Sequence, residues 1–338
     1  MTAGAAPGGD RVRVAAIDCG TNSLRLLVAD VDPVAGSLAD VDRRLEIVRL
    51  GQGVDATGRL APDALARTLS VLRSYAGIIE AAGASAARMV ATSATRDAAN
   101  AAEFVAGVVG VLGVEPEVLS GEEEARLSFT GATAELAGRV AAPYLVVDIG
   151  GGSTEFVLGD PARTGSGPVG IAGLTAAGPA DAAVSVNIGC VRMTERHLHS
   201  DPPAAAEIAA ARADIDAALD VVQAKIPVAA ARTLVGLAGS VTTVAALALG
   251  LDSYRADRIH HARISVAAVR QQTTRLLGQT RAERAGLAVM HPGRVDVIGG
   301  GALVLLRIIE RFGFGEVLVS EHDILDGIAW SLVPDAVR

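Results

Sequence analysis

The sequence predicts an α/β protein built from two related domains that face each other across a cleft. The chain has 338 residues, which corresponds to two domains of about 150 residues each, and predicted strands alternate with predicted helices. Residues 15–30, AAIDCGTNSLRLLVAD, also align without a gap with residues 145–160, LVVDIGGGSTEFVLGD. A single repeat at this spacing indicates two copies of a domain, not an array of short units. We expect a first domain over residues 11–126 and a second over residues 127–338.

The first domain begins with the first copy of the repeat. Residues 15–30 have the pattern of a strand, a glycine turn and a returning strand, and residues 38–50 predict a third strand. Apolar residues at helical spacing predict a helix over residues 62–82, with Pro62 in its first turn, and a second helix over residues 97–112. Short apolar runs predict buried strands over residues 88–92 and 115–119.

The second domain begins with the second copy and continues into a Gly- and Pro-rich stretch, residues 161–181, which we expect to be flexible. The apolar and alternating runs that follow predict strands over residues 183–188, 233–237, 262–265 and 316–319. The helical patterns predict helices over residues 191–199, 201–224, 265–278, 294–311 and 323–333, and one more that begins near Val241.

Three consecutive glycines form the turn of the second hairpin. Gly150, Gly151 and Gly152 can adopt positive φ and let backbone N–H groups approach an anion. Asp148 ends the preceding strand, and a carboxylate beside a phosphate site suits Mg²⁺, which binds carboxylates, waters and phosphate oxygens. Asp18 occupies the matching position in the first hairpin. Two such hairpins facing each other would hold a polyphosphate from both sides.

Several other residues have two interpretations from pattern alone. Arg96 follows a strand, where ligands of α/β sheets bind, although it could also pair with Asp97. Glu124 lies one residue beyond a capping box formed by Ser120 and Glu123, so a catalytic base and a solvated helix face are both open.

Three further positions carry similar expectations. Arg192 follows the turn at residue 189 and is either a phosphate ligand or a helix-surface arginine. Gly239 lies between a strand and a helix start, which favours anion binding. His260 and His261 precede a predicted strand, so we expect them to face opposite ways, with only one directed into a cleft.

The composition excludes several classes of function. The formal net charge is −8 without a block of basic residues, so we expect no nucleic-acid partner. Residues 234–251 carry no charge, but their glycines favour a buried strand, a turn and a helix start over a membrane span, and we expect no membrane partner. The two cysteines are too few for a disulfide framework, and no secretory signal begins the chain, so we expect a reducing, cytoplasmic location.

Seven stretches together resemble the exopolyphosphatase and guanosine pentaphosphate phosphohydrolase family. They are AAIDCGTNSLRLLVAD, ATSATRDAAN, SGEEEARL, LVVDIGGGSTEFVLG, VNIGCVRMTERHL, GLAGSVTT and IHHARIS, spread over nearly the whole chain. This family is part of the actin, heat-shock chaperone and sugar-kinase superfamily. The resemblance therefore implies two ribonuclease-H-like (actin-like ATPase) domains that face each other across a phosphate-binding cleft.

The resemblance also implies roles for individual residues. It makes Glu124 the general base that activates water, and gives Asp148 the task of binding Mg²⁺ or orienting that water, with Glu155 nearby. Asp18 is the partner of Asp148 and would share the metal. The residues implied to hold the phosphate chain are Asn22, Ser23, Arg96, Gly151, Gly152, Ser153 and Gly239.

The resemblance implies Mg²⁺-dependent release of terminal phosphate from polyphosphate or guanosine pentaphosphate by a homodimer. Thr21 stands where family members often have Ser, which keeps the hydroxyl group. Longer members continue into helical domains that help to hold long polymer. This chain is similar to a two-domain short form, so we expect a preference for shorter polyphosphate.

Three alternatives to an exopolyphosphatase stay open at this point. The first is hydrolysis of guanosine pentaphosphate, which presents a similar terminal phosphoanhydride. The second is a kinase of the same superfamily, which would need an acceptor pocket. The third is a sensor of polyphosphate or alarmones without catalysis, although a protein that only binds has no need of a base such as Glu124.

Overall fold

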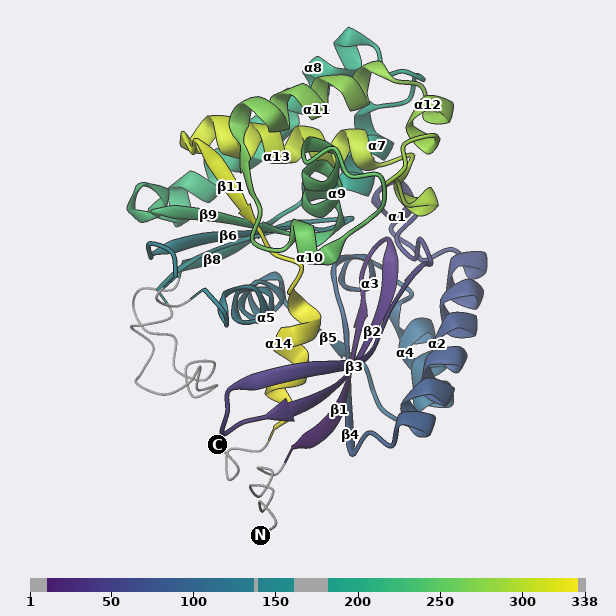
Figure 1. Cartoon of the computed structure of the whole chain (residues 1–338). Coiled ribbons are helices and arrows are strands. Elements are labelled where there is room, and N and C mark those ends of the chain that lie inside the picture. Colours follow the sequence, from purple (N-terminus) through teal and green to yellow (C-terminus); the bar gives the residue numbers. More distant parts are fainter. Residues whose placement is uncertain (1–10, 137–138, 161–181, 334–338) are drawn as a thin grey trace.

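The computed structural model describes residues 11–136, 139–160 and 182–333. These residues form two mixed sheets, one above the other in Figure 1, with helices on the faces of each. The predicted flexible stretch, residues 161–181, lies outside the described residues. The α/β fold class expected from the sequence is confirmed.

The two sheets repeat one strand order. The first has the order β3-β2-β1-β4-β5, and the second has the order β10-β11-β9-β6-β7-β8, so that β8-β7-β6-β9-β11 reproduces the order of the first sheet. In both sheets the first strand pairs antiparallel with the second and parallel with the strand after the crossover. The strands are β1 (Val12–Cys19), β2 (Ser23–Asp32), β3 (Ser37–Ile47), β4 (Ala86–Ala91), β5 (Glu117–Val118), β6 (Tyr144–Ile149), β7 (Thr154–Gly159), β8 (Ala182–Val186), β9 (Thr233–Leu237), β10 (Arg263–Ser265) and β11 (Glu316–Val319).

Helices connect the parallel strands and cover the sheets. They are α1 (Val54–Thr57), α2 (Pro62–Ala82), α3 (Ser93–Arg96), α4 (Ala101–Leu112), α5 (Gly121–Thr133), α7 (Cys190–His197), α8 (Ala205–Lys225), α9 (Ala238–Ala248), α10 (Ala256–Ile259), α11 (Val266–Gly278), α12 (Arg281–Ala285), α13 (Ile298–Phe312) and α14 (Ile324–Ser331), with 3-10 turns η2 (Val228–Ala230) and η3 (Pro292–Arg294). In Figure 1, α2 and α4 lie beside the first sheet, and α8, α11 and α13 lie above the second.

Three predicted helices begin later in the chain than expected, each for a local reason. The helix predicted over residues 97–112 begins at Ala101, as α4, because the side chain of its N-cap residue Asn100 is bound to both backbone polar groups of Leu60, at 2.8 and 3.1 Å. The helix predicted from residue 201 begins at Ala205, after two prolines, since a residue before proline disfavours helical φ and ψ. The helix predicted from residue 294 begins at Ile298, after the 3-10 turn η3.

Helices α5 and α14 pack against each other between the two sheets (Figure 1). α5 contacts β6, β7 and β8 of the second sheet, whereas α14 returns the end of the chain to β1 and β2 of the first sheet. At their crossing, a Cβ on Gly131 of α5 would lie 1.8 Å from the carbonyl oxygen of Asp323. Glycine therefore allows these two backbones to touch. The domain boundary predicted between residues 126 and 127 lies within α5, and it stays a prediction.

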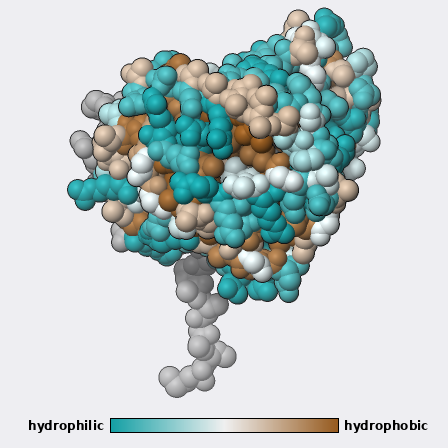
Figure 2. Space-filling view, turned by 90° about the horizontal axis from the view of Figure 1, so that it is seen from above, coloured by the Kyte–Doolittle hydropathy of each residue, from teal (hydrophilic) through white to brown (hydrophobic). Residues whose placement is uncertain are grey.

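The uncharged segment at residues 234–251 forms β9 and α9, as the sequence predicts. No helix among the described residues combines the length and the apolar character that crossing a bilayer requires. Figure 2 shows the molecule from above, where hydrophilic residues cover most of the face and apolar residues are confined to smaller areas.

Candidate active site

The tips of the two repeated hairpins meet at the centre of a cleft. A Cβ on Gly151 would lie 2.9 Å from Thr21 Cβ, and a Cβ on Gly152 would lie 2.6 Å from Ser93 Oγ. Thr21 and Ser93 share a buried hydrogen bond of 2.9 Å. The cleft is lined by polar groups from both halves, among them Asp18, Asn22, Ser23, Glu124, Asp148, Gly151, Ser153 and Gly239.

The glycines of the second hairpin are required by close backbone packing and not by positive φ. None of Gly150, Gly151 and Gly152 has a φ between +20° and +160°, so the expectation of positive φ is wrong. Close approach requires them instead, both to the first hairpin and to the start of α7. A Cβ on Gly189, just before α7, would lie 2.3 Å from the carbonyl group of Gly151.

The strand ends place carboxylates at the base of the cleft. Asp148 on β6 is directly opposite Glu155 on β7 in the register of the pair, and both are buried. Ser128 donates a hydrogen bond of 2.7 Å to Asp148, and Ser185 donates one of 2.7 Å to Glu155. Asp18 is buried at the matching position on β1.

Glu124 completes this group from the opposite side. The predicted capping box of Ser120 and Glu123 begins α5, so the next residue, Glu124, turns toward the protein and is only 8% exposed. Its carboxylate lies 3.4 Å from Arg96 Nη1, which also donates to the carbonyl of Leu119 at 2.8 Å. The solvated-face interpretation of Glu124 is therefore wrong, and Arg96 lies beside it as an ion-pair partner.

Burial raises the pKa of every member of this carboxylate group. It raises the pKa of Glu155 to about 8, with the neighbouring Asp148 adding to the effect. Burial raises the pKa of Asp148 to about 6, against the opposing effects of the Ser128 hydrogen bond and Arg25. The pKa of Glu124 is raised well above its usual range by burial and then by Glu155 and Asp148. Burial also raises the pKa of Asp18, which Arg25 opposes. Ionisation of the whole group would concentrate negative charge in the cleft, and a bound cation would offset that charge.

Arg192 is bound to protein groups: one backbone carbonyl and two carboxylates. Its guanidinium donates to the carbonyl of Gly152 at 2.7 Å, to Asp55 at 2.5 Å and to Asp97 at 2.6 Å. It does not line the cleft between the hairpins. The expectation of a phosphate contact is corrected: Arg192 joins α7 of the second half to two carboxylates of the first, because the hairpin tips bring α7 beside α1.

The third glycine turn takes the position that the sequence predicted for it. α9 begins at Ala238, earlier than expected, and its N-cap residue Leu237 makes no side-chain capping bond. Ala238 has φ of 68°, which turns the chain sharply between β9 and the helix. Gly239 contacts the guanidinium of Arg294, because a Cβ on Gly239 would lie 2.5 Å from that group. A helix N-terminus without a side-chain cap, next to an arginine, suits an anion.

Two arginines of the cleft were missed by sequence reasoning. Arg25 and Arg294 line it together with the polar residues Thr92, Ser93 and Ser240. A signal existed for Arg25, because the repeat aligns it with Glu155, so that both hairpins carry a charge at the same place. Arg294 ends the 3-10 turn η3 before α13 and has no local pattern that would single it out.

The two neighbouring histidines differ from the expectation. His261 has φ of 61°, and its ring stacks on that of His260 with centroids 3.7 Å apart, so the pair does not face opposite ways. His260 Nδ1 accepts the Glu321 N–H at 3.2 Å, and its Nε2 lies 3.4 Å from Glu135. Neither histidine lines the cleft between the hairpins.

Residues 27–336 match the Ppx/GppA phosphatase family. The chain belongs to this family. Its members are part of the actin-like ATPase superfamily, in agreement with the repeated strand order and the two ribonuclease-H-like halves. Exopolyphosphatase 2 of Mycobacterium tuberculosis (strain H37Rv) is 50% identical over 331 residues, which cover 95% of this chain and 98% of that protein.

Solved structures of the family agree with the fold. The crystal structure of an exopolyphosphatase-like protein has a TM-score of 0.87 and 43% identity, and covers 95% of this chain and 98% of its own. The Ppx/GppA enzyme of Aquifex aeolicus has a TM-score of 0.75 and 30% identity, and covers 95% of this chain and 99% of its own.

Proposed function

We propose that this protein is an exopolyphosphatase that releases the terminal phosphate of inorganic polyphosphate by hydrolysis. The observation that carries the proposal is the meeting of two hairpin tips over a group of four buried carboxylates, Asp18, Glu124, Asp148 and Glu155. The 50% identity to a protein named exopolyphosphatase supports the substrate class.

The carboxylate group fits a divalent cation. Asp18 Oδ1 and Glu155 Oε2 are buried and have no hydrogen-bond partner among the described residues, and oxygen ligands of this kind suit Mg²⁺. Phosphatases of this family generally use divalent metals. We assign Mg²⁺ to Asp148 and Asp18, where its charge would neutralise phosphate oxygens.

The remaining groups would bind the phosphate chain. Arg96 is not among the residues that line the cleft, but it pairs with Glu124, which does, and a terminal phosphate beside that carboxylate would meet both. Hydroxyl, amide and backbone groups of the two hairpins and of α9 line the same cleft as Glu124. We assign phosphate binding to Asn22, Ser23, Arg96, Gly151, Gly152, Ser153 and Gly239, and not to Arg192.

Glu124 is the proposed general base, and Glu155 supports it through charge. In its ionised form Glu124 takes a proton from water, the water oxygen forms a bond to the terminal phosphorus, and the bridging oxygen leaves with the shortened chain. Arg96 lies 3.4 Å from the carboxylate and favours that ionised form. Positioning and charge supply most of the catalysis in such a reaction.

Guanosine pentaphosphate is a second candidate substrate, favoured by a neighbouring cavity. This cavity of ≈ 500 Å³ shares Arg25, Gly239 and Arg294 with the cleft and continues to Tyr254 and His291. Its size is typical of small-molecule sites, and its aromatic and guanidinium groups suit a base and its phosphates.

Parallel assays test the two substrates. Phosphate release is measured with Mg²⁺ from medium-chain polyphosphate and from guanosine pentaphosphate, for the native chain and for Glu124→Gln. Phosphate release from polyphosphate by the native chain, with a large loss of that release in Glu124→Gln, supports the proposal. Release from the nucleotide alone would make the protein a guanosine pentaphosphate phosphohydrolase, and binding without release from either would make it a sensor.

The raised pKa values predict a pH-dependent response to Mg²⁺. Burial raises the pKa of Asp148 to about 6 and that of Glu155 to about 8, so the cation-free fold loses stability as pH rises from the usual carboxyl pKa of about 4 to those values. The cation must displace the protons of these groups, and its affinity rises over the same range. We expect Mg²⁺ to raise Tm more at about pH 8.5 than at about pH 6, measured by thermal unfolding.

A matched variant isolates this effect. Glu155→Gln removes the group with the higher pKa and should make the Mg²⁺-dependent change in Tm less sensitive to pH. An equal change in Tm at both pH values in the native protein would contradict the prediction.

We also propose a cytoplasmic homodimer. Cys19 and Cys190 are buried free thiols, which fits a reducing compartment. Sedimentation at several concentrations tests the oligomeric state, and a monomer at all of them would contradict it.

A further inference from the structure

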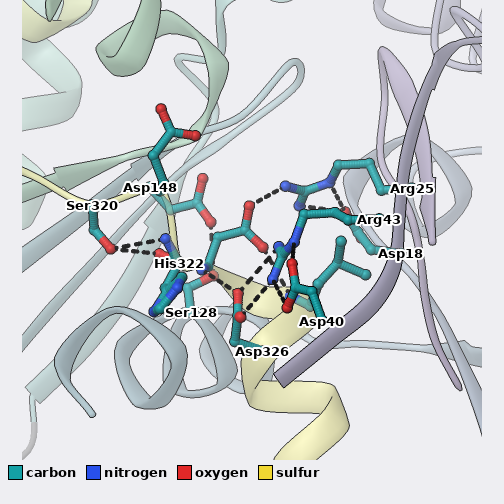
Figure 3. A network of polar contacts seen from close by, with 12 residues as sticks. Asp18, Arg25, Asp40, Arg43, Ser128, Asp148, Ser320, His322 and Asp326 are labelled. Atoms are coloured by element: carbon teal, nitrogen blue, oxygen red, sulfur yellow. Dashed lines mark hydrogen bonds and ion pairs between the residues drawn. The ribbon is translucent and has the colours of Figure 1, made fainter. Parts of the chain in front are cut away.

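Arg25 is held between two carboxylates from opposite ends of the chain. Its Nε and Nη2 donate to the same oxygen, Oδ2 of Asp18, at 2.9 and 2.6 Å, while its Nη1 donates to Asp323. The other oxygen of Asp18, Oδ1, is buried and has no hydrogen-bond partner in the part of the chain that the structure describes. Figure 3 shows Arg25 and Asp18 as one side of a polar network that continues through Arg43 to Asp326.

Asp323 is fixed in place by contacts of its own. It is buried and caps α14, its Oδ1 accepting the Leu325 N–H at 2.9 Å, and its own N–H donates to Asp326 at 2.9 Å. Asp326 accepts in turn from Arg43 at 2.7 Å. The Asp323 backbone also rests on Gly131 of α5. These contacts hold the Asp323 carboxylate in place, so it is a fixed acceptor for Arg25 and would not move if the Arg25 side chain moved.

A guanidinium usually pairs with a carboxylate through two parallel hydrogen bonds, one to each oxygen. Such a pair between Arg25 and Asp18 would occupy both Asp18 oxygens. In this structure the third nitrogen of Arg25 is engaged by Asp323, and both remaining donors share one oxygen of Asp18. The free oxygen belongs to one of the two residues that we assign to the divalent cation.

We propose that Asp323 is a positioning residue that keeps Arg25 on one oxygen of Asp18 and so leaves the other oxygen for the divalent cation. This inference rests on the proposed function, because it takes the cation site as given. It adds a role for a residue that lies on neither hairpin and that makes no contact with the phosphate chain in the proposed arrangement.

Direct binding of Mn²⁺, followed by electron paramagnetic resonance, tests the proposal apart from activity. Asp323→Asn keeps a capping oxygen but weakens the hold on Arg25. We expect its Mn²⁺ affinity to fall about 10–100-fold, as is typical when a group that orients a metal ligand is altered. Asp40→Asn removes the same charge from an exposed partner of Arg43 and should bind Mn²⁺ like the native protein.

A double-mutant cycle separates positioning from a simple charge effect. If Asp323 acts through Arg25, then adding Asp323→Asn to an Arg25→Met variant should change Mn²⁺ affinity little. An equal loss with and without Arg25 would overturn the proposal, as would native Mn²⁺ affinity in Asp323→Asn. If thermal unfolding shows that Asp323→Asn does not fold, Asp323→Ser keeps a good helix cap and replaces it in the cycle.

The outcomes also distinguish this inference from the proposed function. A native protein that binds no Mn²⁺ would refute the cation site and with it both proposals. A native protein that binds Mn²⁺ and releases phosphate, beside an Asp323→Asn variant with unchanged affinity, would refute only the role of Asp323.

Discussion

Glu124→Gln is expected to lower the rate of phosphate release by about 10²–10⁴-fold, the usual contribution of a general base. Glutamine has the same shape but cannot accept a proton from water. Its amide oxygen can still accept from Arg96, whose Nη1 lies 3.4 Å from the carboxylate. Substrate binding should therefore persist while turnover is lost.

The stability of this variant should not fall. Burial, and then the neighbouring Glu155 and Asp148, raise the pKa of Glu124, so replacing Glu124 with a neutral side chain removes an unfavourable buried charge and its repulsion within the group. Thermal unfolding of the Gln variant should show a Tm at or above that of the native protein. A loss of activity with a lower Tm would point to misfolding instead of a missing base.

A neighbour on the same helix provides the control. Glu122 lies in the first turn of α5 and is exposed, so Glu122→Gln should leave the rate unchanged. The decisive measurement is single-turnover phosphate release together with substrate binding for both variants. A native rate in Glu124→Gln would rule out its role as the base.

The repeated hairpin could be predicted from the sequence because its signals are local. Each copy carries its strands, glycine turn and terminal aspartate within 16 residues, and a strand pair of that kind needs no distant partner to be recognised. The capping box of Ser120 and Glu123 is also local, and the structure confirms it.

The residues whose place the sequence pattern left open or did not reveal depend on distant contacts. Whether Glu124 faces solvent is decided by the packing of α5 against the second sheet. Arg192 is drawn to Asp55 and Asp97, which are 137 and 95 positions away. Arg294 reaches the cleft only because the 3-10 turn η3 lies beside Gly239. No local pattern contains the information on these three residues. Arg25 differs from them, because the repeat aligns it with Glu155 and so gave a signal within the sequence.

Gly131→Ala is expected to destabilise the protein by about 1–3 kcal/mol or more, the cost of adding a methyl group to a site with no free volume. The added Cβ would lie 1.8 Å from the Asp323 carbonyl oxygen and 3.1 Å from the Gly327 nitrogen. Both are backbone atoms, so rotation of a side chain cannot relieve the clash. The two helices must separate, which exposes apolar residues that α14 buries against the first sheet, such as Ile328 and Ala329.

A second glycine gives the opposite expectation and serves as the control. Gly110 lies inside α4, and a Cβ there would have no atom within 4 Å, so Gly110→Ala should stabilise the protein by about 0.5–1 kcal/mol. Urea unfolding of both variants measures the difference. An unchanged unfolding midpoint for Gly131→Ala would contradict the prediction, because it would show that α5 and α14 can separate at little cost. Because α5 carries Glu124 and α14 is capped by Asp323, a separation of the two helices should also lower phosphate release. The fold and the site therefore depend on the same backbone contact.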